Sequence, residues 1–118
     1  MYTIKVEDSF SAAHNLRGYK GQCEALHGHN WKIEAIVGKK KLDKIGMVID
    51  FRLIKLGLKA VLDKLDHKYL NEITYFRKVN PTSENIAKFI YDEIKKKIPH
   101  LKAITVWESE NSSATYVE

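Results

Sequence analysis

The chain has 118 residues, which fits a single domain over residues 1–118 that buries about two thirds of its unfolded surface. One cysteine excludes an internal disulfide, and the N-terminus lacks the long apolar run of a signal peptide or membrane span, so we expect a cytoplasmic protein with a reduced thiol. The net charge of +5 comes largely from lysines interleaved with acids or on helical faces, which favours a solvated surface and is compatible with a small anionic substrate. No combined aromatic and basic signature of nucleic-acid binding is present, so we expect neither a nucleic-acid nor a membrane partner.

The first half of the chain predicts two antiparallel strands joined by a loop. Residues 2–14 alternate between apolar and polar side chains, and His14 ends the apolar row. Residues 15–26 hold two glycines and several polar side chains, which predicts a long loop. Alternation returns over residues 27–37. A turn and a connector follow.

Two amphipathic helices are predicted next. Asp50 is in the position of an N-cap for residues 51–65, where apolar side chains recur at helical spacing. An irregular segment separates this helix from a second one, which Thr82 or Ser83 caps and Pro99 ends.

The last part of the chain predicts two further strands, over residues 102–109 and 114–117, with a turn between them. The order ββααββ predicts an α+β fold with a four-stranded antiparallel sheet and two helices on one of its faces. Since such a sheet has two unpaired edges, we expect the chain to associate with other copies of itself.

Three histidines predict a metal site. His27 and His29 are two residues apart in a strand, so their imidazoles point to the same side, and His14 ends the apolar row of the neighbouring strand. Three imidazoles with an open fourth position are a common form of catalytic zinc site. The alternative is that His27 and His29 are merely two surface histidines of a strand, which would have the same spacing. His100 lies in a polar stretch and is expected on the surface.

Five further residues are candidates for chemistry, each with a simpler alternative. Cys23 is a further metal ligand, an inert buried thiol or an acid/base group, and the last is open because a thiol beside a cationic metal ionises more readily. Glu24 is either an acid/base group or a solvated loop carboxylate. Asp66 and His67 form either an acid/base pair or the end of a helix. Glu108 is either the exposed end of a strand or an anchor for a ligand with paired N–H donors.

Several motifs together resemble a known family. Their positions are 10–14 (FSAAH), 23–30 (CEALHGHN), 47–51 (MVIDF), 65–71 (LDHKYLN), 81–85 (PTSEN) and 106–109 (VWES). In order and spacing they are similar to the 6-pyruvoyltetrahydropterin synthase and 6-carboxytetrahydropterin synthase family, over nearly the whole chain.

The resemblance implies the tunnelling fold, in which subunits join edge to edge as trimeric barrels and two barrels stack as a hexamer with active sites between subunits. It implies Zn²⁺ as cofactor, bound by His14, His27 and His29. For the remaining positions it implies proton transfer by Cys23, Asp66 and His67, and pterin binding by Glu108, Thr82 and Glu84.

The implied activity is a lyase reaction on 7,8-dihydroneopterin triphosphate, with triphosphate elimination. The spacing from Cys23 to His27 resembles the 6-carboxytetrahydropterin synthases of 7-deazaguanine (queuosine or archaeosine) biosynthesis, while 6-pyruvoyltetrahydropterin is the product of the other main branch. A glutamate at position 24 is similar to the pattern of a third branch of the family, which releases 6-hydroxymethyl-7,8-dihydropterin for folate synthesis. A chain with both Cys23 and Glu24 could therefore form both products. A non-catalytic zinc- or pterin-binding module is the alternative of another class.

Overall fold

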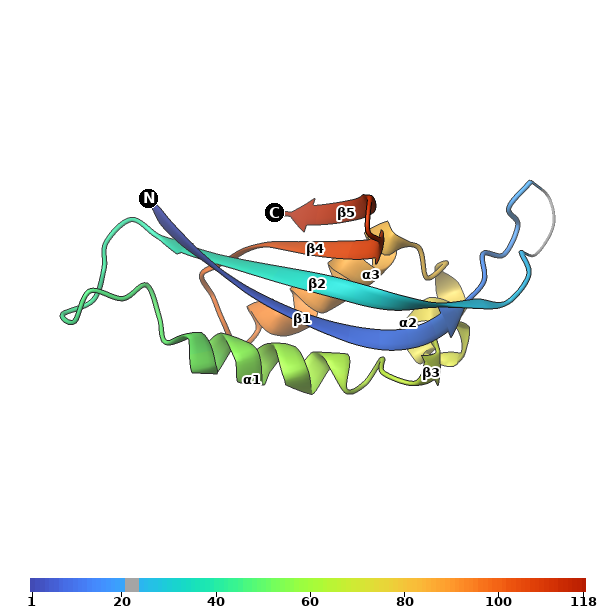
Figure 1. Ribbon diagram of the computed structural model, residues 1–118, viewed down its shortest axis with the longest axis horizontal. Coiled ribbons are helices and arrows are strands. Elements are labelled where there is room, and N and C mark those ends of the chain that lie inside the picture. Colours follow the sequence, from blue (N-terminus) through green and yellow to red (C-terminus); the bar gives the residue numbers. More distant parts are fainter. Residues whose placement is uncertain (21–23) are drawn as a thin grey trace.

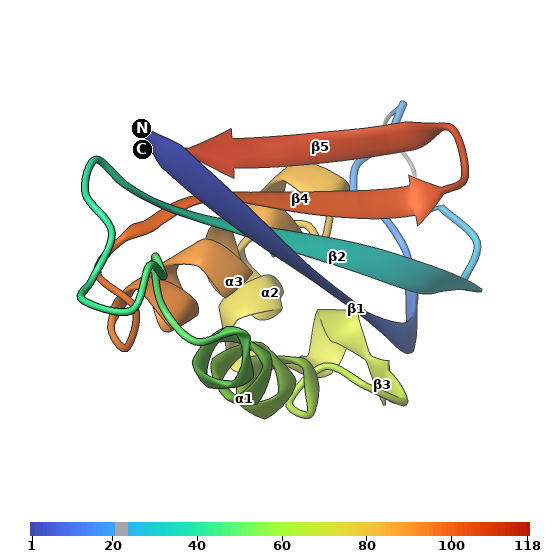
Figure 2. The same ribbon diagram turned by 60° about the vertical axis from the view of Figure 1, so that its left-hand side comes forward.

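The computed structural model describes residues 1–20 and 24–118. They form an elongated body of 55 × 26 × 23 Å, in which one twisted sheet carries its helices on a single face (Figures 1 and 2). Cys23 lies outside the described residues. Within the described part of the chain, no helix is long and apolar enough to cross a membrane.

The sheet contains the four predicted strands and a short fifth one. The strands are β1 (Tyr2–His14), β2 (His27–Lys39), β3 (Lys68–Tyr69), β4 (Leu101–Ser109) and β5 (Ser112–Val117). Their order across the sheet is β3-β1-β2-β4-β5, and β1, β2, β4 and β5 pair antiparallel. The predicted antiparallel arrangement of the four long strands is therefore confirmed.

The prediction of a purely antiparallel four-stranded sheet is wrong at one edge. β3 pairs parallel with the end of β1, where Ala12 faces Lys68 and Ala13 faces Tyr69. A strand of two residues has no alternation to reveal it in the sequence. Its position is fixed by the preceding turn, in which the backbone N–H of His67 donates to the carbonyl of Ser11 at 2.6 Å.

Helix α1 (Phe51–Leu62) begins where the sequence predicts, and the Asp50 carboxylate accepts a hydrogen bond from the backbone N–H of Arg52 at 2.9 Å. It ends three residues earlier than predicted. The chain continues in hydrogen-bonded turns to His67, whose φ of +57° lies in the left-handed region. This reversal brings the chain back to β1, and a longer helix would carry it past that strand.

The segment predicted to be irregular is in fact ordered into short helices. A 3₁₀ turn, η1 (Leu70–Glu72), is followed by α2 (Thr74–Lys78). Leu70 and Phe76 are fully buried, so these turns cover one end of the core. Elements of three to five residues are too short to show helical periodicity, which is why the sequence did not reveal them.

Helix α3 (Ser83–Lys95) packs beside α1 on the same face of the sheet (Figure 2). The side chain of Thr82 caps it by accepting a hydrogen bond from the backbone N–H of Asn85 at 3.1 Å. The core lies between this helical layer and the sheet. Its largest fully buried side chains are Trp31, Phe76, Ile33, Ile54, Leu58, Leu65, Leu70, Ile86, Ile90, Ile94, Leu101 and Ile104.

Substituting Thr82 with alanine is expected to lower the free energy of unfolding by about 1 kcal/mol, because the first turn of α3 loses its side-chain acceptor. Urea unfolding in the absence of any pterin measures this loss, and Thr82→Ser, which keeps the hydroxyl, is the matched control. A Thr82→Ala protein as stable as the parent would contradict the capping role.

Candidate metal centre

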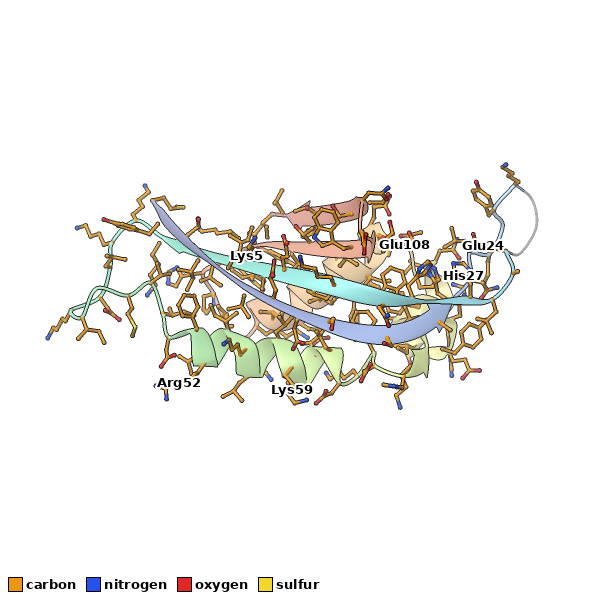
Figure 3. The ribbon with its side chains drawn as sticks, viewed as in Figure 1. Lys5, Glu24, His27, Arg52, Lys59 and Glu108 are labelled. Carbon is orange, nitrogen blue, oxygen red and sulfur yellow. The ribbon has the colours of Figure 1, made fainter. Side chains whose placement is uncertain are left out.

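Two strands bring the predicted histidines together at one end of the sheet, and a third strand adds a carboxylate. His14 ends β1 and lies directly opposite His27, the first residue of β2, in the antiparallel register. His29 follows two residues later on the same side of β2, opposite Ala12. Glu108 comes from the end of β4, and Figure 3 shows it at the same end of the molecule as His27.

The side chains of these four residues form one compact cluster. One potential ligand atom from each residue lies within 4.8 Å of those of the others. His14 Nε2 is 3.0 Å from His27 Nε2, and His29 Nε2 is 3.0 Å from Glu108 Oε1. The three imidazoles and the carboxylate therefore converge on a single point.

Backbone carbonyls orient two of the imidazoles. Nδ1 of His14 donates to the carbonyl of Pro81 at 2.8 Å, and Nδ1 of His27 donates to the carbonyl of Ala25 at 2.9 Å. A proton on Nδ1 leaves the lone pair of Nε2 free to face the centre of the cluster. Hydrogen bonds of this kind commonly fix the tautomer of metal-binding histidines.

The cluster is built on the aromatic core. His14 is 2% exposed, and its ring and that of His29 meet Trp31 edge to face, with centroids 4.9 and 5.1 Å from the indole. Burial lowers the pKa of His14 from its ordinary value, and the hydrogen bond to Pro81 opposes this only in part. His14 is therefore a neutral imidazole at pH 7, which is the form that binds metals.

The donor set fits Zn²⁺. Although the Glu108 carboxylate comes within 3.0 Å of His29 Nε2, its direction of approach makes no hydrogen bond. This buried nitrogen consequently has no hydrogen-bond partner among the described residues. A cation held by the three imidazoles would satisfy this nitrogen, and three imidazoles with a carboxylate are ligands that suit zinc.

Glu108 connects this cluster to helix α3. Its second oxygen, Oε2, accepts a hydrogen bond from the hydroxyl of Ser83 at 3.4 Å. Ser83 is 9% exposed and is the first residue of the helix. In the sequence it was only an alternative cap, and no local pattern pointed to its contact with a strand 25 residues away.

Asp66 and His67 form the predicted pair, but away from the histidine cluster. Asp66 Oδ2 lies 3.0 Å from His67 Nδ1, and Asp66 Oδ1 accepts from the backbone N–H of Ser11 at 2.9 Å. The Ser11 hydrogen bond, followed by that from His67, holds the pKa of the Asp66 carboxyl below its usual value, so it is ionised at neutral pH. The His67 side chain is 82% exposed. In the described part of the chain, neither residue contacts the four-residue cluster.

The other predicted site residues lie at different distances from the cluster. Glu24 is at its edge, with Oε1 3.8 Å from His27 Nδ1. Figure 3 shows the two side chains close together. Glu84 is exposed in the first turn of α3, next to the Thr82 cap. The predicted role of Cys23 falls outside the described residues.

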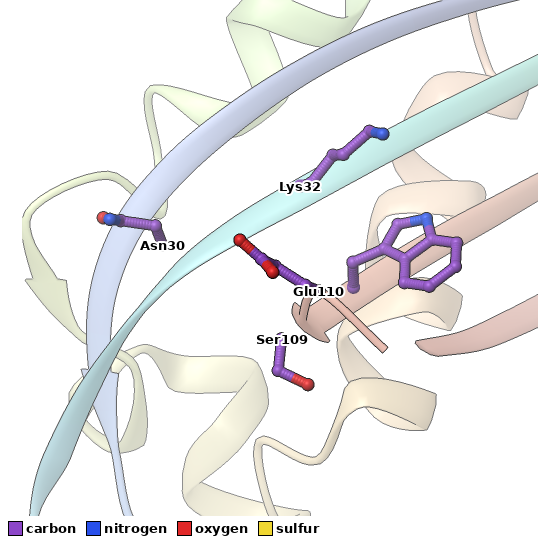
Figure 4. Close-up of a pocket in the computed structure, with 5 residues that line it drawn as sticks. Asn30, Lys32, Ser109 and Glu110 are labelled. Carbon is purple, nitrogen blue, oxygen red and sulfur yellow. The ribbon is translucent and has the colours of Figure 1, made fainter. Parts of the chain in front are cut away.

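A separate cavity of about 420 Å³ lies on the opposite face of the sheet. Its lining residues are Asn30, Lys32, Trp107, Ser109 and Glu110 (Figure 4). Because side chains alternate along a strand, Asn30 and Lys32 point away from the side that His29 occupies. This cavity is therefore not part of the metal centre.

Comparison with known proteins identifies the family. A protein-family model described as 6-pyruvoyl tetrahydropterin synthase matches residues 3–118. The chain is 36% identical over 122 residues to a 6-carboxy-5,6,7,8-tetrahydropterin synthase of Synechocystis, covering 98% of this chain and 93% of the relative. It is 39% identical over 103 residues to a dihydroneopterin monophosphate aldolase of Pyrococcus furiosus, covering 85% and 83%.

The fold agrees with these sequence matches. The structure of Caenorhabditis elegans 6-pyruvoyl tetrahydropterin synthase superimposes with a TM-score of 0.86 at 28% identity, covering 99% of this chain and 95% of that one. The tunnelling fold and the resemblance seen in the motifs are thus confirmed. The chain belongs to the 6-pyruvoyl tetrahydropterin synthase family of pterin-biosynthesis enzymes.

Proposed function

We propose that the chain is a zinc-dependent lyase that converts 7,8-dihydroneopterin triphosphate and water to 6-carboxy-5,6,7,8-tetrahydropterin, acetaldehyde and triphosphate. The observation that carries the proposal is the convergence of His14, His27, His29 and Glu108 in a chain whose relatives include tetrahydropterin synthases. The product would be a precursor for 7-deazaguanine biosynthesis.

The histidines would bind Zn²⁺, and the chain's other residues would hold the pterin and move protons. When bound, the metal would make the hydroxyl groups and adjacent C–H bonds of the substrate side chain more acidic. Glu108 would accept hydrogen bonds from the paired N–H donors on the pterin edge, with Thr82 and Glu84 nearby on α3. Cys23 would remove a proton from the side chain, and Asp66 would keep the imidazole of His67 oriented as the partner acid/base.

Assembly into a hexamer of two trimers is part of this proposal. Within one chain the exposed His67 imidazole lies apart from the metal cluster, so it would act at the site of an adjacent subunit. The outer edge of β5 and most of the outer edge of β1, which β3 covers only at Ala12 and Ala13, leave backbone groups for pairing with other copies.

Aldol cleavage is the second candidate, and Glu24 is the observation that favours it. This carboxylate lies 3.8 Å from His27 Nδ1, at the edge of the cluster, and the Pyrococcus furiosus relative is named dihydroneopterin monophosphate aldolase. Cleavage of the C1′–C2′ bond would yield 6-hydroxymethyl-7,8-dihydropterin and an aldehyde that keeps the phosphate. A dual activity would use both residues, Cys23 for one product and Glu24 for the other.

The test is to incubate zinc-loaded protein with dihydroneopterin triphosphate, and separately with the monophosphate, and to identify the products by mass. We expect Cys23→Ala to abolish 6-carboxytetrahydropterin while zinc stays bound, and Glu24→Gln to abolish any 6-hydroxymethyl product. Loss of one proton-transfer group typically slows a reaction about 10²- to 10⁴-fold.

Three results would contradict parts of the proposal. Zinc-loaded protein that binds pterin without consuming it would be the non-catalytic module. Turnover unaffected by either substitution would show that the bases lie elsewhere. A fully active monomer would exclude sites shared between subunits.

A further inference from the structure

Two asparagines fasten the loop between β1 and β2 to the segment between α1 and α3. The side chain of Asn71 accepts from the backbone N–H of Asn15 at 3.0 Å and donates to the carbonyl of the same residue at 2.8 Å. Asn80 pairs in the same way with Arg17, at 2.9 Å for both bonds. Each amide thus pairs with one loop residue as a neighbouring strand would, and Asn71 is only 8% exposed.

The side chain of Asn15 extends this fastening across the loop. Its Oδ1 accepts from the hydroxyl of Tyr69 at 2.7 Å, and its Nδ2 donates to the backbone carbonyl of Glu24 at 3.1 Å. The Tyr69 hydroxyl fixes the side-chain oxygen of Asn15, and the Asn71 amide fixes its backbone. The Asn15 NH₂ group therefore has one direction in which to donate. Glu24 is the residue in that direction.

Glu24 is also held by the backbone of Leu16, the residue after Asn15. Its N–H donates to the carbonyl of Leu16 at 2.9 Å, and the N–H of Leu16 donates to Glu24 Oε1 at 3.3 Å. The same Oε1 lies 3.8 Å from Nδ1 of His27. The carboxylate at the edge of the metal centre therefore depends on a chain of hydrogen bonds that begins at the side chains of Tyr69 and Asn71.

We propose that Asn15 is a positioning residue that holds the Glu24 carboxylate beside the metal centre, and that aldol cleavage of a dihydroneopterin phosphate depends on it. The catalytic part of this inference rests on the proposed function, while the positioning of Glu24 does not. A base displaced by about 1 Å can cost two orders of magnitude in rate, so the bond from Asn15 would affect the reaction that uses Glu24 more than the one that uses Cys23.

The test compares two conservative variants with a matched control. Asn15→Asp keeps the shape and the acceptor for Tyr69 but removes the donor to Glu24, and Tyr69→Phe removes the bond that orients Asn15. Both are expected to lower the ratio of 6-hydroxymethyl to 6-carboxy product about tenfold while KM and zinc content stay within about twofold of the parent. Asn80→Ala, which loosens the same loop only at Arg17, is expected to leave the ratio unchanged.

Hydrogen exchange at the Glu24 amide separates this inference from the proposed function. Asn15→Asp is expected to accelerate that exchange about tenfold, and Asn80→Ala to leave it unchanged, whether or not the protein turns over substrate. Accelerated exchange in a protein that consumes no substrate would refute the proposed function and retain the positioning role. Unchanged exchange in Asn15→Asp would overturn the positioning role of Asn15. A parent that consumes substrate but forms no 6-hydroxymethyl product, or an equal change of ratio in Asn80→Ala, would overturn the dependence of aldol cleavage on Asn15.

Discussion

Replacing His29 with alanine is expected to weaken zinc binding about a hundredfold or more and to abolish turnover at stoichiometric metal. Structural zinc sites bind with about 10–16 kcal/mol shared among four ligands, so one imidazole accounts for a few kcal/mol. His29 is the best histidine for this test, because its Nε2 has no hydrogen-bond partner among the described residues, although its removal also removes the 3.0 Å contact with Glu108 Oε1. His14, by contrast, is buried and bonded to Pro81, so its removal would also leave a cavity and an unpaired carbonyl.

Metal content after dialysis and a competition titration with a chelating dye measure this effect. His100→Ala is the matched control, since His100 is an exposed histidine that stands outside the four-residue cluster. His29→Ala protein that still binds one zinc per chain with the parent's affinity would show that the cluster is not the metal site.

Glu108→Gln is expected to lower kcat/KM at least a hundredfold while zinc stays bound. Two N–H donors on a pterin would give a carboxylate two charge-assisted hydrogen bonds, each contributing about 1.5–3 kcal/mol, and an amide offers only one acceptor oxygen. Glu110→Gln, a carboxylate of the adjoining turn, is the matched control. The Glu108→Gln variant also decides between two roles for Glu108, pterin anchor and metal ligand, because Glu108 Oε1 lies 3.0 Å from Nε2 of His29.

A fourth metal ligand would behave differently from a pterin anchor. If Glu108 were such a ligand, Glu108→Gln would lose zinc along with activity, and excess zinc would restore part of the rate. The affinity for a dihydropterin that lacks a side chain, measured from the fluorescence of the pterin, tests the anchoring role independently of turnover. Unchanged pterin affinity in Glu108→Gln would exclude the anchoring role.

The sequence predicted the elements whose periodicity is long enough to read. Alternation over residues 2–14 and 27–37 placed His14, His27 and His29 on one side, and the structure brings them together. The N-cap at Asp50 was likewise visible, and Thr82 was one of two candidates for the second cap, because a capping side chain acts within three residues of itself.

The parts that the sequence did not reveal depend on contacts between distant residues. The parallel pairing of β3 joins residues 56 positions apart, Ala12 with Lys68 and Ala13 with Tyr69. Asn71 and Asn80 read as ordinary loop residues until the fold places them against Asn15 and Arg17. Glu108 was singled out in the sequence as a carboxylate on an apolar row, but its proximity to the histidines came from β4 lying beside β2.

The backbone conformation of His67 bears on which amino acid suits position 67. Its φ of +57° is reached easily by glycine and costs other residues roughly 1 kcal/mol or more. Folding alone therefore favours glycine at position 67, and the largely exposed imidazole adds little burial to offset the cost. If His67 carries protons as proposed, a fold-stability screen of this chain would select glycine there at the expense of activity.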